Sequence, residues 1–181
     1  MKNSSIIHIS LTGHRPTKLG GYDISQSPYK KLQDDLEQYI QYQLQSHDIV
    51  VGHSGLALGA DTIWSKAILS MKEQYPGRVE FHAEIPFMTQ HSKWFKKSDI
   101  DFWHEQVNAA DGQSVYADFD SSVSNQEAGK ALNDRNIGMI DHADILLALW
   151  DGSHGGTGNA VKYARSNQLP IQFIDPKNYF N

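Results

Sequence analysis

Short apolar runs alternate along this chain with segments whose apolar residues recur at helical spacing. The strand-like runs cover residues 6–11, 48–52, 78–85, 114–119, 144–150 and 171–174. Between the first two runs, Leu32, Leu36, Ile40 and Leu44 form one apolar stripe at a spacing of four residues. This alternation predicts an α/β fold, Rossmann-like and doubly wound, with a mainly parallel sheet and helices on both faces.

Three helix starts are marked by local signals. Ser27 precedes Pro28, and proline is favoured at the first helical position. The segment from Ser98, Ser-Asp-Ile-Asp, resembles a capping box and predicts a helix there. A second capping box, Ser124-Asn-Gln-Glu127, predicts a helix that runs to about His142.

Composition narrows the class of protein. A length of 181 residues suits a single domain over 1–181, and a net charge of −5 without a basic block argues against nucleic acid as a partner. The chain has no cysteine, and no apolar run approaches the roughly 20 residues of a membrane span. The N-terminus does not resemble a signal peptide, so we expect a cytoplasmic protein without membrane association.

A glycine-rich stretch at residues 152–158 follows the fifth strand-like run. The next segment carries Ala160, Val161 and Ala164 on one helical face. A strand that enters a helix through glycines leaves backbone N–H groups free at the positive end of the helix dipole. The order therefore predicts a phosphate site, although a tight connection that merely needs small residues is the structural alternative.

Other chemistry-bearing residues also follow strand-like runs. Four groups of residues each follow one of these runs: residues 12–15, the pair Ser54-Gly55, Pro86 and the pair Asp151-Gly152. In open parallel sheets, ligands bind beyond the carboxyl ends of the strands. These residues are therefore expected to surround one ligand.

Several motifs resemble known families. Ser54-Gly-Leu-Ala-Leu-Gly-Ala-Asp61 resembles a motif of the DNA-processing protein DprA, and the segment 135–144 resembles the Arg-Lys-x-x-Met-x-x-x-Ala-Asp motif of Lonely Guy phosphoribohydrolases. Gly155-Gly-Thr-Gly158 looks like the Gly-Gly-x-Gly-Thr loop of the same enzymes. Nearly the whole chain is similar, in order, to the YpsA-like family of the SLOG superfamily, which includes phage and prophage members.

The resemblance implies a nucleotide or a nucleotide-derived, ADP-ribose-type ligand, with sensing or sequestering as the role and no other cofactor. The ligand-binding residues expected from the motifs are Thr12, Gly13, His14, Arg15, Ser54, Gly55, Gly59, Asp61, Pro86, Gln90, Trp94, Arg135, Asn136, Asp151, Gly155, Gly156, Thr157, Gly158 and Asn159. Two alternatives stay open: an N-glycosidase or nucleoside (deoxy)ribosyl transferase, and a DprA-like module for single-stranded DNA. Lonely Guy relatives are dimers, so a homodimer is expected by analogy.

One departure from the Lonely Guy pattern bears on catalysis. The alignment places Asn159 at the last Thr of the loop motif and Lys162 at the catalytic Glu. A lysine cannot supply the carboxylate that glycosidic cleavage requires. Phosphoribohydrolase activity of the Lonely Guy type is therefore not expected.

The roles of several single residues have two interpretations. Asp61 fits a ligand contact or a helix N-cap, and Arg15 fits a phosphate contact or a solvated loop. His14 fits a ribose or base contact, or packing on Pro16, and Trp94 fits stacking on a base or the core.

A general base on a glycosidic bond has several candidates, and no spacing identifies one. The carboxylates near the expected strand ends are Glu84, Asp101, Asp118, Asp120 and Asp151. The nine histidines show no metal-binding spacing along the sequence, so we expect no metal.

Overall fold

The computed structural model describes residues 5–119 and 123–180 of the chain. The strands form one six-stranded sheet in the order β4-β3-β2-β1-β5-β6. Every neighbouring pair is parallel. The strands are β1 (Ile6–Gly13), β2 (Ile49–Ser54), β3 (Val79–Ile85), β4 (Gly112–Val115), β5 (Ile145–Leu149) and β6 (Ile171–Ile174). The predicted fold class is confirmed.

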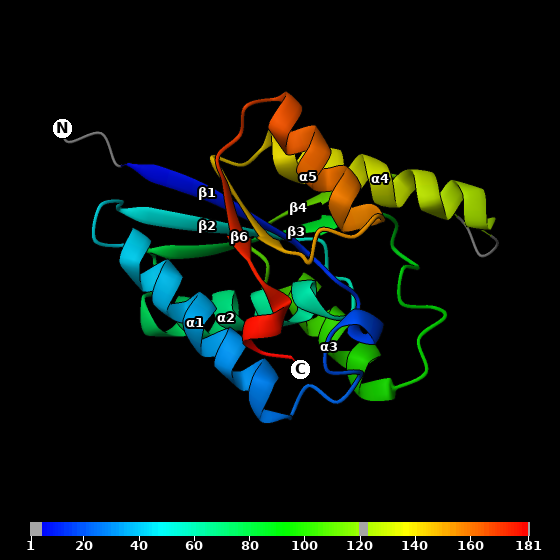
Figure 1. Ribbon diagram of the computed structural model, residues 1–181, viewed down its shortest axis with the longest axis horizontal. Helices are drawn as coiled ribbons and strands as arrows, with labels where there is room; N and C mark the ends of the chain where they lie inside the picture. Colours follow the sequence, from blue (N-terminus) through cyan, green and yellow to red (C-terminus); the bar gives the residue numbers. More distant parts are fainter. Residues whose placement is uncertain (1–4, 120–122, 181) are drawn as a thin grey trace.

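Helices cover both faces of the sheet (Figure 1). One layer holds α1 (Ser27–Gln43), α2 (Ala60–Gln74) and α3 (Lys97–Ala109), and the other holds α4 (Asn125–Asp141) and α5 (Gly156–Ser166). The 3₁₀ turns η1 (Pro16–Lys18) and η2 (Pro176–Asn178) follow β1 and β6. After β4 the chain returns through α4 to place β5 beside β1, so the strand order reverses between these two strands. Such a reversal is where open α/β sheets bind ligands.

The two faces of β1 differ in chemistry because side chains alternate along a strand. Ile7, Ile9 and Leu11 are buried in the main hydrophobic core, which includes the apolar stripe of α1 and much of α2. Ser10 lies on the opposite face, and its hydroxyl donates to the Met139 carbonyl of α4 at 2.7 Å. The sheet thus packs against α1 and α2 through the main apolar core. Its face toward α4 is mixed, because Ser10 donates to α4 while Leu146 of β5 shares a smaller apolar cluster with Ile140 of α4.

The capping box at Ser124 is confirmed, and the one at Ser98 is wrong. Ser124 accepts from the Glu127 N–H, and the Glu127 carboxylate accepts from the Ser124 N–H. In contrast, α3 begins after Lys96, which makes no side-chain cap. Asp101, the acidic member of the expected box, pairs instead with Lys97 at 2.6 Å.

The strand expected at 114–119 is shifted toward the N-terminus. β4 spans Gly112–Val115 and pairs with the end of β3. The Tyr116 N–H donates to the Ile85 carbonyl at 3.0 Å, and β3 ends at Ile85. In the part of the chain that the structure describes, β3 offers no further partner beyond Ile85, so residues 117–119 do not extend β4.

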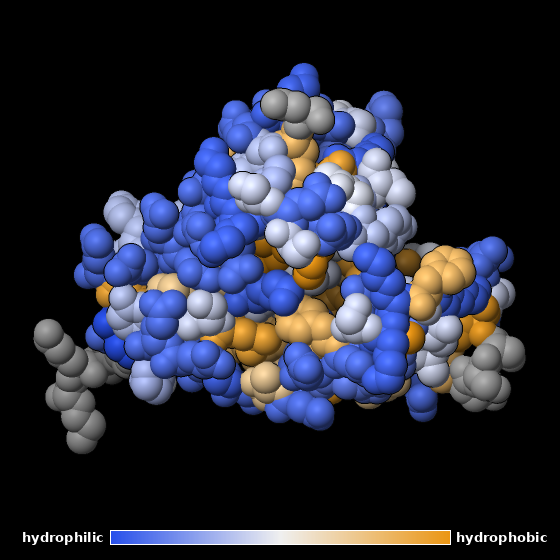
Figure 2. All heavy atoms as spheres, turned by 90° about the horizontal axis from the view of Figure 1, so that it is seen from below, coloured by the Kyte–Doolittle hydropathy of each residue, from blue (hydrophilic) through white to orange (hydrophobic). Residues whose placement is uncertain are grey.

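The outer surface of the α1–α3 layer is mainly hydrophilic, with smaller apolar areas near its centre and toward its right-hand edge (Figure 2). This is the pattern of amphipathic helices whose apolar stripes face the sheet. Among the described residues, no helix combines the length and apolar character that crossing a bilayer requires.

Candidate anion-binding site

The carboxyl ends of β1 and β5 meet at a cavity of about 410 Å³. The segment after β1, the start of α2, one side of α4 and the loop before α5 form its wall. The lining residues are Leu11, Thr12, Gly13, His14, Arg15, Thr17, Lys18, Ala57, Asp61, Leu132, Arg135, Asn136, Met139, Ser153, His154, Gly155, Gly156, Thr157 and Gly158. Motifs that are far apart in sequence therefore surround one space.

The glycine loop presents the N-terminus of α5 to this cavity. Gly155 is the N-cap residue, with a φ of 141° that L side chains rarely adopt. The Asn159 N–H donates to the Gly155 carbonyl at 2.9 Å, so the N–H groups of Gly156, Thr157 and Gly158 precede the first intrahelical hydrogen bond. These groups and the positive end of the helix dipole favour an anion.

Hydrogen bonds within the loop fix its shape. The Asp151 carboxylate accepts from the Ser153 N–H at 2.9 Å, and the Trp150 indole donates to the Ser153 carbonyl at 2.7 Å. A Cβ on Gly158 would lie 3.0 Å from that same carbonyl. The loop therefore stays close against its own helix, which leaves the N–H groups exposed on the cavity side.

Arg135 reaches the cavity from α4 and is almost completely buried, with 4% of its surface exposed. Its Nη1 donates to the Asp61 carboxylate at 3.3 Å. Among the described residues, none accepts a hydrogen bond from its buried Nε. Burial lowers the pKa of the guanidinium and Asp61 raises it. A guanidinium keeps its charge in proteins, so this cation is only partly compensated.

Gly55 makes room for that guanidinium. A Cβ built on Gly55 would lie 1.3 Å from Nη1 of Arg135. Ser54 and Gly59 also support the wall, although neither residue lines the cavity. The Ser54 hydroxyl donates to the Asp61 carbonyl at 3.3 Å. Gly59, with a φ of 102°, caps α2, and a Cβ built on it would lie 2.6 Å from the His14 carbonyl oxygen.

Asp61 is therefore not the N-cap of α2, since Gly59 holds that position. The carboxylate of Asp61 lies in the first helical turn, where it accepts from the Ala57 N–H at 3.3 Å and from Arg135. The N-cap interpretation is wrong, and a ligand contact by Asp61 stays a prediction.

His14 has a fixed protein partner that the sequence did not reveal. It is buried, and its Nε2 lies 2.8 Å from the Asp151 carboxylate across the β1–β5 junction. Hydrogen bonds from Ser153 and from His14 hold the pKa of Asp151 below its ordinary value. The carboxylate thus holds the loop, and Asp151 is not among the residues that line the cavity.

Positive charge collects around the cavity although the protein is acidic. Arg15, Lys18 and Arg135 line it, and Asp61 is the carboxylate among the lining residues. The Lys18 ammonium donates to the Ser153 hydroxyl at 2.7 Å. Sequence reasoning missed Lys18, Ser153 and His154. Their positions directly beside the motifs were the only available signal.

Four other expected ligand residues lie outside this cavity. Gln90 is structural, since its amide donates to the Gly55 carbonyl at 3.1 Å and accepts from Trp103. Trp94 lines a separate cavity of about 490 Å³ on the α1–α3 side. Pro86 follows β3, away from the cavity wall, and Asn159 lies within α5. We place the site at the smaller cavity because the motif residues converge there.

The remaining carboxylates are distributed elsewhere. Asp101 pairs with Lys97, Asp118 is exposed, and Asp120 lies outside the described residues. Glu84 is completely buried below α4, where its carboxylate accepts from His53, Tyr116 and His142. Burial alone would raise the pKa of Glu84, but the hydrogen bonds from His53 and Tyr116 lower it to about 2.

A doubly wound parallel sheet with a cavity at its switch point defines a Rossmann-like domain. The family model for YpsA, described as the YspA SLOG family, matches residues 9–179. The chain therefore belongs to the YpsA family of SLOG proteins, as its motifs predicted.

Relatives and solved structures agree with this assignment. The chain is 28% identical over 148 residues to the uncharacterized SPbeta prophage-derived protein YoqJ of Bacillus subtilis, covering 78% of this chain and 85% of YoqJ. It is 26% identical over 177 residues to a UPF0398 protein of Bacillus pumilus, covering 92% of this chain and 86% of the relative.

Two DprA structures share the fold at low sequence identity. DprA of Helicobacter pylori, described for its single-stranded DNA binding mode, matches with a TM-score of 0.61 and 15% identity over 96% of this chain and 71% of its own. DprA of Streptococcus pneumoniae matches with a TM-score of 0.62 and 14% identity over 94% of this chain. The chain spans 50% of the pneumococcal protein.

Proposed function

We propose that the cavity between β1 and β5 binds a phosphorylated nucleotide or a nucleotide-derived, ADP-ribose-type ligand. The observation that carries the proposal is Arg135. This arginine is buried, has one carboxylate contact at 3.3 Å and leaves Nε without an acceptor among the described residues. A buried cation with unsatisfied donors costs free energy unless an anion completes its shell.

The rest of the cavity suits the other parts of such a ligand. The N–H groups of Gly156, Thr157 and Gly158 offer a phosphate position, and Arg15 and Lys18 offer positive charge for a second one. A volume of about 410 Å³ lies within the roughly 300–1,000 Å³ of small-molecule sites. A mass spectrum of any small molecule released on denaturation would identify the ligand directly.

Replacing Arg135 is the first test of this site. Arg135→Ala is expected to weaken AMP or ADP-ribose binding by about 1.5–3 kcal/mol, the range for a hydrogen bond to a charged group. Isothermal titration calorimetry measures it. Arg165→Ala, a change in the last turn of α5, is the matched control and should leave affinity unchanged.

Since Arg135 is buried, Arg15→Ala provides a second variant at an exposed residue of the same wall. It should also weaken binding while the circular dichroism spectrum stays that of the wild type. Unchanged affinity in both folded variants would show that the nucleotide does not bind in this cavity.

Binding without cleavage is the expected outcome with AMP. Asp61, the carboxylate of the cavity wall, pairs with Arg135, and Lys162 is exposed on α5 outside the wall. Carboxylate acid–base assistance is worth about 10²–10⁴-fold in rate, so its loss should leave no measurable release of adenine over hours. Lys162→Glu should not create activity, because position 162 does not border the cavity. Sustained adenine release by the wild type would instead support the glycosidase alternative.

Single-stranded DNA is a second candidate ligand. The fold shared with DprA and the cationic cavity mouth both favour it, because phosphodiesters could contact Arg15 and Lys18. The net charge of −5 opposes avid binding to a long polyanion. Fluorescence anisotropy of a labelled oligothymidylate, with AMP and ADP-ribose as competitors, decides between the two. Tight DNA binding that neither nucleotide displaces would favour the DprA-like function.

A further inference from the structure

A cluster of histidines surrounds Glu84 on the sheet face that α4 covers. His8, His53 and His82 come from β1, β2 and β3, and His142 directly follows α4. The parallel register pairs His53 with His82, and their rings stack with centroids 5.0 Å apart. These residues are distant in sequence, so no spacing of histidines could reveal the cluster.

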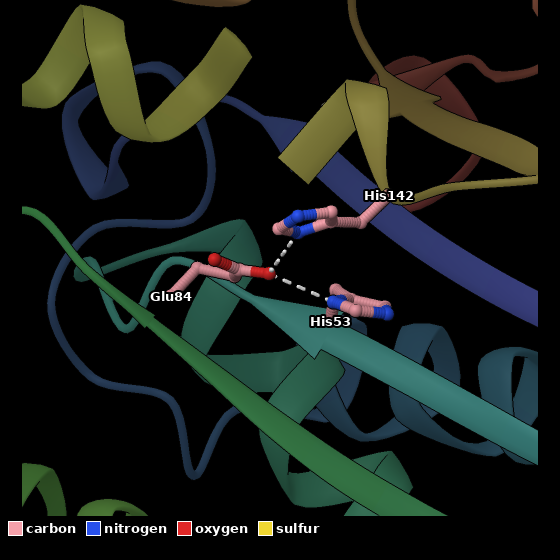
Figure 3. A group of neighbouring side chains, drawn as sticks. All are labelled: His53, Glu84 and His142. Atoms are coloured by element: carbon pink, nitrogen blue, oxygen red, sulfur yellow. Dashed lines mark hydrogen bonds and ion pairs between the residues drawn. The ribbon is translucent and has the colours of Figure 1, made fainter. Parts of the chain in front are cut away.

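Three of these side chains direct ligand atoms toward one point (Figure 3). Oε1 of Glu84 lies 2.8 Å from Nδ1 of His53 and 3.3 Å from Nδ1 of His142. The three ligand atoms all lie within 4.8 Å of one another. Oε2 of Glu84 accepts from the Tyr116 hydroxyl at 2.6 Å, which fixes the carboxylate with Oε1 toward the two imidazoles.

We propose that His53, Glu84 and His142 form a binding site for one divalent transition-metal ion of the zinc class. Zinc binds imidazole nitrogen and carboxylate oxygen at about 2.0–2.2 Å, which places tetrahedral ligand atoms about 3.4 Å apart. The observed separations from Oε1 are 2.8 and 3.3 Å, so small side-chain rotations would admit the ion. Two imidazoles favour zinc, nickel or copper over magnesium or calcium.

His8 can accept the ring proton of a metal-bound His53. A metal-bound imidazole usually donates its other ring N–H to a neighbouring group. Nε2 of His53 lies 2.9 Å from Nδ1 of His8. With a metal on Nδ1 of His53, a proton on Nε2 of His53 can be donated to Nδ1 of His8, which then carries its own proton on Nε2.

Further coordination positions are available on the solvent side. The His142 side chain is 49% exposed, which gives an ion or water an entry path. Nε2 of His82 lies 3.9 Å from Oε1 of Glu84 and is a candidate fourth ligand. None of these residues lines the nucleotide cavity, so the proposed metal site is separate from the function proposed above.

The test measures zinc binding by the chelator-treated, untagged full-length chain. The wild type should bind one equivalent of Zn²⁺ in calorimetry, and Co²⁺ should give the strong visible absorption of a low-coordinate imidazole site. His142→Ala should weaken Zn²⁺ binding at least about 10-fold, because even outer-shell partners contribute 10–100-fold. Excess Mg²⁺ should not compete.

His104→Ala is the matched control, since His104 is an exposed histidine on α3, across the sheet from the cluster. It should bind Zn²⁺ as the wild type does. Glu84→Gln should also bind Zn²⁺ more weakly. Glu84 is buried, so if Glu84→Gln does not fold, the exposed-site variant His142→Ala alone tests the proposal. Absence of saturable Zn²⁺ binding, or equal affinity in wild type and His142→Ala, would show that the cluster is only a hydrogen-bonded network.

Discussion

Gly55→Ala is expected to displace Arg135 and to cause the largest loss of any single-methyl change at the site. The added Cβ would lie 1.3 Å from Nη1 and 2.2 Å from Cζ of the guanidinium, so the side chain must leave its position. Overpacking and the broken contact with Asp61 should together lower the free energy of unfolding by about 2–4 kcal/mol. Nucleotide affinity should fall at least as far as in Arg135→Ala. Urea denaturation and calorimetry measure the two effects.

Gly129→Ala is the control for this change. Gly129 lies exposed within α4, and a Cβ there would meet no atom within 4 Å. Alanine is the better helix former by about 1 kcal/mol, so this variant should be neutral or slightly more stable. If Gly55→Ala proved as stable as Gly129→Ala and still bound nucleotide, the described packing of Arg135 against Gly55 would be incorrect.

Asp61→Ala should lower the free energy of unfolding by about 2–3 kcal/mol. It leaves the buried guanidinium of Arg135 without its carboxylate and the Ala57 N–H without its acceptor. Breaking a fully buried ion pair costs about 3–5 kcal/mol, and the loss here should be smaller because Arg135 borders a cavity. Chemical denaturation at neutral pH provides the measurement.

Asp99→Ala separates the ion pair from the helix-dipole effect. Both aspartates lie in the first turn of a helix, Asp61 in α2 and Asp99 in α3. Removing either loses the favourable dipole interaction of roughly 0.3–1 kcal/mol, so the difference between the variants reports the contact with Arg135. A phosphate ion that binds beside Arg135 should also stabilise Asp61→Ala more than the wild type. Equal losses in the two variants would contradict a structural role for this pair.

Helix α4 connects the two proposed sites. It presents Arg135 to the nucleotide cavity, and His142 follows its last turn beside Glu84. Ser10 ties the same helix to β1 through the Met139 carbonyl at 2.7 Å. One part of α4 thus borders the cavity proposed to bind a nucleotide, and its end lies beside the histidine cluster.

The sequence by itself determined the order of the elements and the position of the glycine loop at the start of α5. Alternating apolar runs and helical stripes require a layered α/β fold, because each stripe must be buried against a sheet. The glycines at 155, 156 and 158 marked the start of α5, because the turn between a strand and a helix needs backbone conformations that glycine adopts. The capping box at Ser124 was readable because both of its hydrogen bonds are local.

Only the tertiary structure decided which distant residues share a space. The partner of His14 is Asp151, and Glu84 gathers His53 and His142, because parallel strands bring together residues tens of positions apart. Trp94 lies in the loop between β3 and α3 and lines the separate cavity on the α1–α3 side. The pattern along a chain fixes which side of an element is buried. The strand order and the crossovers fix which ends meet, and they depend on contacts between segments that local sequence does not encode.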